Sequence, residues 1–116
     1  MFATDNLIRQ IVPRMQASLT KPTSFLKVEV PVTMADYPAV RGLLVRGEMP
    51  VYIITLQGWD HPRVRQPHVV LMAHTEAGII GAIDKHFDAL RAQGYEFKTQ
   101  TKPAMIAYIK TRKIAG

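Results

Sequence analysis

The residues best suited to chemistry lie together in the segment 58–67. This segment contains the one tryptophan of the chain, Trp59, and the arginines Arg63 and Arg65. Guanidinium groups bind phosphate oxygens, and an indole ring stacks on a nucleobase or fills a pocket in a partner protein. Loops of this length in a small domain often carry its function. We therefore predict that these three residues contact a partner; the alternative is that Trp59 packs back against the end of a sheet.

A second group of basic residues lies in the C-terminal third, where no acidic residue follows Glu96. The group consists of Lys98, Lys102, Lys110, Arg112 and Lys113. The aromatic residues between these charges are Tyr95, Phe97 and Tyr108. If the segment forms paired strands, Lys98 and Lys110 lie on one face of the sheet. We predict that the five basic residues contact the phosphates of a nucleic acid; the alternative is a solvated surface that confers solubility.

The sequence contains no signature of a catalytic or metal site. The histidines are His61, His68, His74 and His86. No two of them are four residues apart, whereas zinc proteases place two histidines at that spacing on a helix and any zinc site needs three or four converging ligands. His86 is two residues from Asp84 and from Asp88, and residues two apart on a helix do not face each other. We therefore expect a protein that is not an enzyme and that binds no metal or cofactor.

The charge of the chain favours a negatively charged partner. Fifteen Lys and Arg residues stand against nine Asp and Glu residues, which gives a net charge of +6. Such a surface attracts polyanions because each cation that meets a phosphate releases a condensed counterion. The first candidate partner is therefore nucleic acid or a nucleoprotein complex, followed by an acidic protein surface.

Composition excludes several other classes. The chain has no cysteine, so disulfides, thiolate zinc sites and iron–sulfur clusters are excluded. No apolar run reaches the roughly 18 residues of a membrane span. Residues 1–6 also lack the basic and apolar regions of a secretory signal, so we expect a cytoplasmic protein that does not bind membranes.

The length predicts one domain, residues 1–116, because 116 residues with 47% hydrophobic content suffice for a single core. Apolar residues spaced by four predict a helix over 5–19, which Pro13 bends or divides. Alternation predicts a strand over Leu26–Val32, and Pro31 favours an edge position for it. A capping box predicts a helix over 33–46.

The second half of the chain predicts four further elements. β-branched apolar runs over 51–56 and 68–73 predict two strands covered on both faces, joined as a hairpin by the long loop. Thr75 caps a helix that ends at Gly94, and Gly78 and Gly81 let this helix approach the sheet closely. Alternation predicts a strand over 95–101. The segment 104–110 is predicted as a last strand, with a helix as the alternative.

The predicted order is therefore αβαββαββ, an α+β fold with a mostly antiparallel sheet and helices packed on one face. Its βαββαβ core, residues 24–101, matches the order of ferredoxin-like split βαβ sandwiches. The expected function is that of a small basic binding protein that docks on nucleic acid. The alternative is a protein–protein module from a phage or mobile element, either an inhibitor of a host defence complex or a virion assembly subunit. Such a module would pair or oligomerise through edge strands over Leu26–Val32 or Ala104–Ile109.

Overall fold

The computed structural model describes residues 13–14, 21–30, 52–58 and 67–111. This part of the chain forms an α+β fold with three strands and two helices. In chain order they are β1 (Leu26–Val30), β2 (Tyr52–Leu56), β3 (His68–Ala73), α4 (Glu76–Ala92) and α5 (Lys102–Lys110). The predicted α+β class and the strands over 51–56 and 68–73 are thus confirmed for the residues that are described.

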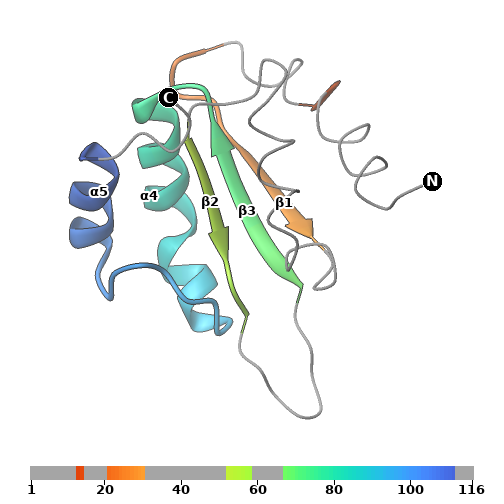
Figure 1. Ribbon diagram of the computed structural model, residues 1–116, viewed down its shortest axis with the longest axis vertical. Helices are drawn as coiled ribbons and strands as arrows, with labels where there is room; N and C mark the ends of the chain where they lie inside the picture. Colours follow the sequence, from red (N-terminus) through yellow and green to blue (C-terminus); the bar gives the residue numbers. More distant parts are fainter. Residues whose placement is uncertain (1–12, 15–20, 31–51, 59–66, 112–116) are drawn as a thin grey trace.

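The sheet has the strand order β1-β3-β2, and both neighbours of β3 are antiparallel to it. Val70 at the centre of β3 faces Val28 of β1 and Thr55 of β2. The predicted hairpin of β2 and β3 is therefore confirmed. Because β1 and β2 both run opposite to β3, they are parallel to each other and separated by it (Figure 1).

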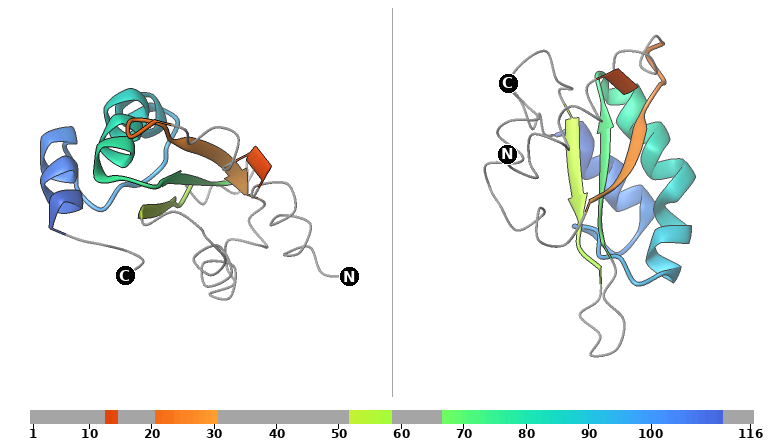
Figure 2. Two further views of the ribbon diagram at one scale, coloured as in Figure 1. Left: turned by 90° about the horizontal axis from the view of Figure 1, so that it is seen from above. Right: turned by 90° about the vertical axis from the view of Figure 1, so that its right-hand side faces the viewer.

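Helix α4 covers one face of this sheet, and α5 packs against α4. Figure 2 shows α4 stacked over the sheet and α5 beside α4 on the side of β2. Ile54 and Leu71 face each other in the ladder and pack against the apolar side of α4, where Ile83 and Phe87 are buried. This core between sheet and helix holds the described elements together, because burial of apolar side chains is the main favourable term in folding.

The central strand is also buried on its other face. Every residue of β3 is buried, and its side chains alternate between the two faces. Met72 and Val70 point away from α4 together with Leu26 and Val28 of β1. The prediction that this strand is covered on both faces is confirmed. β1 instead alternates between buried and more exposed residues, as its sequence pattern predicts.

Helix α4 begins and ends where the sequence places its caps. The Thr75 hydroxyl accepts a hydrogen bond from the Gly78 amide at 3.0 Å, and Glu76 lies in the first turn. The carboxylate is favourable there because the N-terminus of a helix carries a partial positive charge. Gly94 ends the helix with φ 99°, a conformation that glycine adopts without steric cost.

The strand predicted over 104–110 is wrong, because this segment belongs to helix α5. The Thr101 hydroxyl caps the Ala104 amide at 3.3 Å, and Pro103 lies in the first turn, where its fixed φ favours a helix. Met105 and Ile109, four residues apart, are both about 1% exposed. Burying both of these side chains, which lie four residues apart, favours a helix over the strand that the local alternation suggested.

The strand predicted over 95–101 is also wrong. This segment forms a single bridge, between Glu96 and Gln57, and then turns towards α5. Since Gly94 reverses the chain at the end of α4, only the first residues after it come alongside β2. The predicted order αβαββαββ is therefore not confirmed.

Other expectations lie outside the described residues. They are most of the helix over 5–19, the helix over 33–46, and most of the loop over 58–67. Within the first of these ranges, Pro13 and Arg14 are described and are helical. The ferredoxin-like arrangement is not confirmed, because its helix over 33–46 lies outside the described residues and its last strand, predicted over 95–101, forms a single bridge.

One glycine of α4 permits the close approach to the sheet. A Cβ at Gly78 would lie 2.5 Å from the carbonyl oxygen of Ser24 and 2.9 Å from the Cβ of Ala73. A Cβ at Gly81 would meet Thr23 and Phe25 at ordinary contact distances of 3.7 and 3.8 Å. The prediction of a close approach is thus confirmed for Gly78 and wrong for Gly81.

We expect Gly78→Ala to lower the free energy of unfolding by about 1–3 kcal/mol, because the added methyl group would push the backbone of α4 away from the Ser24 carbonyl. Gly81→Ala is the matched control on the same helix. It should be neutral or raise the free energy of unfolding by up to about 1 kcal/mol, since alanine has the higher helix propensity. Urea denaturation of the three proteins measures both, and equal effects of the two substitutions would contradict this explanation.

Candidate functional site

Three of the eight predicted site residues lie in the part that the structure describes. They are Lys98, Lys102 and Lys110. The other five, Trp59, Arg63, Arg65, Arg112 and Lys113, lie outside the described residues. The alternative packing of Trp59 against the sheet falls outside them as well, so both interpretations of this loop stay predictions.

The structure does not bring Lys98 and Lys110 together on one sheet face. Lys98 lies in the connection between α4 and α5, and Lys110 is the last residue of α5. A rise of about 1.5 Å per residue places the two ends of this helix roughly 12 Å apart. The pairing predicted from strand alternation is therefore wrong, because one of the two strands is a helix.

The three lysines differ in what they contact. The Nζ of Lys102 lies 3.3 Å from Oδ1 of Asp84 on α4, a pair whose side chains are 33% and 68% exposed. Exposed pairs of this kind contribute little to stability. Lys98 and Lys110 are exposed and form no ion pair within the described ranges. Their charges are therefore available to an anion from outside.

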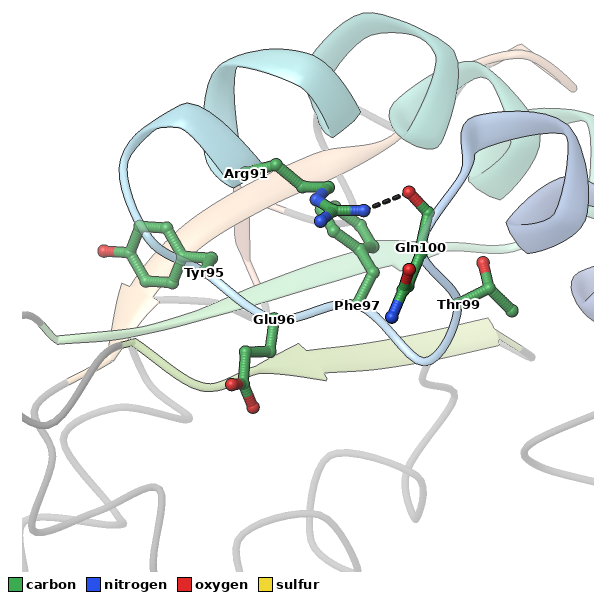
Figure 3. Close-up of a pocket in the computed structure, with 6 residues that line it drawn as sticks. All are labelled: Arg91, Tyr95, Glu96, Phe97, Thr99 and Gln100. Atoms are coloured by element: carbon green, nitrogen blue, oxygen red, sulfur yellow. Dashed lines mark hydrogen bonds between the residues drawn. The ribbon is translucent and has the colours of Figure 1, made fainter.

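A pocket of about 290 Å³ lies beside Lys98, between the last turn of α4 and the segment that leads to α5 (Figure 3). Its lining residues are Arg91, Tyr95, Glu96, Phe97, Thr99 and Gln100. This volume is at the lower end of the range of about 300–1,000 Å³ for small-molecule sites. The pocket thus fits one small group.

Arg91 is held in a defined position at this pocket. Its Nη1 donates a hydrogen bond to the backbone carbonyl of Gln100, and its guanidinium lies 5.8 Å from the centre of the Phe87 ring. Figure 3 shows the carboxylate of Glu96 directed away from Arg91. Since a guanidinium has five N–H donors, most of the donors of Arg91 have no protein acceptor in the described part.

Phe97 packs against the core beneath Arg91. Its ring lies 4.4 Å from that of Phe87, with an angle of 31° between the ring planes. The side chain is half-buried, so part of the ring faces the pocket. Phe97 falls within the strand predicted over 95–101, and the structure places it in a connection instead. The role of Arg91 was missed, and the signal for it is its position in the last turn of α4, three residues before Gly94.

Tyr95 also lines the pocket, with its ring directed away from Arg91 (Figure 3). The residue is 5% exposed, and burial raises the pKa of its phenol, with a further contribution from the negative charge of Glu29. The hydroxyl therefore keeps its proton at neutral pH and offers a hydrogen-bond donor.

A second cluster of charged and aromatic groups lies on the opposite side of α4, next to β1. The rings of Phe25 and His86 meet edge to face, with 5.6 Å between their centres, and the Nζ of Lys85 lies 5.8 Å from the centre of the Phe25 ring. Burial lowers the pKa of His86, and the positive charges of Lys27 and Lys85 lower it further. His86 is therefore neutral at pH 7.

We expect the free energy of unfolding to fall as the pH falls below about 6.5, the ordinary pKa of histidine. The folded state binds the proton of His86 less readily than the unfolded state, so protonation favours unfolding. His86→Gln removes this contribution. Denaturation curves of both proteins between about pH 5 and pH 8 give the difference, and a difference that does not change with pH would contradict the effect.

The described residues contain no group of three or more His, Cys, Asp or Glu side chains placed to hold a metal ion. Neither of the described helices has the length and apolarity to cross a membrane. His68 is buried in β3, and its Nδ1 has no hydrogen-bond partner among the described residues. The candidate site is accordingly the surface around the pocket, with Arg91, Phe97 and Lys98 as its main groups.

The described residues form a small α+β fold, and the chain is basic. No protein-family model, no curated protein and no solved structure matches the chain. The side chains described above are therefore the basis for a functional assignment.

Proposed function

We propose that this protein is a small, non-catalytic binding protein that docks on nucleic acid or on a nucleoprotein complex through a cationic surface. The observation that carries the proposal is the exposed Lys98, which forms no ion pair with the described residues and lies in the segment that lines the same pocket as Arg91, whose guanidinium has unused donors there. Both groups bind phosphate oxygens, Lys98 as a point charge and Arg91 through its planar array of donors. Cytoplasmic location remains a prediction from the sequence.

The net charge of +6 supports the same proposal. Binding that depends on phosphate contacts is mostly electrostatic and has little sequence preference, because phosphates are the same at every position. The proposed contacts are the cations of the two basic segments together with Trp59. They are Trp59, Arg63, Arg65, Lys98, Lys102, Lys110, Arg112 and Lys113.

The charged groups around His86 on α4 agree with a binding role. His86 has the cations Lys27 and Lys85 as its charged neighbours, whereas a general base that is oriented for catalysis has a carboxylate or a similar acceptor. The groups near it therefore favour a structural role.

Replacing Lys98 with alanine should reduce the salt dependence of binding to nucleic acid. Each lost phosphate contact lowers the slope of log K against log salt by about 0.7–0.9. Lys98→Ala is therefore expected to lower the slope by roughly that amount. Lys102→Ala should have a smaller effect because Asp84 already neutralises part of that charge. Fluorescence anisotropy with a labelled oligonucleotide between about 50 and 200 mM salt measures the slopes.

Lys85→Ala is the matched control, since Lys85 is an exposed lysine that lies over Phe25 on the other side of α4. It should leave the slope unchanged. If Lys85→Ala and Lys98→Ala lower the salt slope equally, the protein attracts nucleic acid by its overall charge and has no defined contact region.

The loop predicted from the sequence has its own test. Replacing Arg63 and Arg65 together with alanine should also lower the salt slope, by up to about twice the value for one contact. The measurement is the same anisotropy titration. A slope equal to that of the unchanged protein would remove this loop from the contact region.

The protein–protein module is the second candidate. The observation that favours it is the position of β1, which forms a ladder with β3 alone among the described strands. An edge strand offers backbone groups to an extended segment of another chain. However, Lys27 and Glu29 lie on this strand, and charged residues on an edge oppose such pairing. The second edge predicted over Ala104–Ile109 is a helix and does not offer strand pairing. A partner retained at high salt would favour this candidate.

A further inference from the structure

We propose that the pocket beside Lys98 binds one unstacked base of a single-stranded nucleic acid. This inference rests on the proposed function and deepens it, because it selects single strands over duplexes. The size of the pocket is the first argument. About 290 Å³ fits a single planar group, and a duplex keeps its bases paired and stacked away from such a cavity.

The walls of the pocket are the second argument. Nucleobases stack on aromatic rings and on guanidinium planes. The Phe97 ring lies on Phe87 at 4.4 Å, and the guanidinium of Arg91 is held by the Gln100 carbonyl and the Phe87 ring. Both planar groups are therefore fixed before a ligand binds, which reduces the entropy that is lost on binding.

The polar groups around the pocket are the third argument. Glu96, Thr99 and Gln100 line the same cavity, with the carboxylate of Glu96 directed away from Arg91 (Figure 3). They provide both donors and acceptors for the edge of a base, which an unpaired base exposes and a base pair occupies.

Lys98 completes the arrangement. It lies in sequence between the lining residues Phe97 and Thr99, and it is exposed. A base in the pocket brings its phosphate to the surface of the same segment, where the ammonium group of Lys98 is available. Stacking and phosphate binding thus come from adjacent residues of one connection.

The test compares a single strand of about 12 nucleotides, as DNA and as RNA, with the duplex of the same sequence. We expect Phe97→Leu to weaken binding of the single strands about tenfold, because stacking of one base contributes that much or more. Binding of the duplex and the salt slope should not change. Phe25→Leu is the matched control, since Phe25 is another half-buried aromatic residue, located on the opposite side of α4.

A measurement on the unchanged protein covers the case in which Phe97→Leu does not fold. The ring-proton signals of Phe97 should shift on titration with the single strand, because a stacked base adds its ring current, and should not shift with the duplex. If both nucleic acids bind but the shifts and the Phe97→Leu effect are absent, the pocket inference is wrong and the proposed function stands. If neither nucleic acid binds at low salt, the proposed function is wrong as well.

Discussion

The close contact between the first turn of α4 and the segment before β1 is the constraint on which the described structure depends. Gly78 lies so close to the Ser24 carbonyl and to Ala73 of β3 that no side chain fits there. The Thr75 hydroxyl accepts from the Gly78 amide and donates to the carbonyl of Pro22, so the same turn also joins the helix to this segment. Once this end of α4 is fixed, its apolar side lies along the sheet.

The position of α4 determines where the candidate site forms. Its last turn carries Arg91, and Gly94 then reverses the chain so that Tyr95 and Phe97 pack against the core. The connection to α5 therefore crosses the end of the core, with its aromatic side chains inward and Lys98 outward. The other side of α4 carries Lys85 and His86 against Phe25, so cations lie on both sides of the helix.

Patterns that depend on neighbouring residues predicted much of this fold. The continuous apolar run gave β3 its bounds, and Thr75 and Gly94 marked the ends of α4, because strand burial and helix caps are local properties. The segment 104–110 fits both periods locally, and the prediction chose the wrong one. Met105 and Ile109 are buried against α4, and this contact with a distant part of the chain favours the helix.

For the candidate site, too, some features follow from the sequence and others only from the tertiary structure. Composition alone determined an excess of positive charge and the absence of cysteine, and the order of residues placed several cations in the C-terminal third. Only the tertiary structure decided that Lys102 pairs with Asp84 and that Lys98, in the connection before α5, lies apart from Lys110 at the end of this helix. These outcomes depend on how two helices pack, and such packing is set by contacts between residues far apart in sequence.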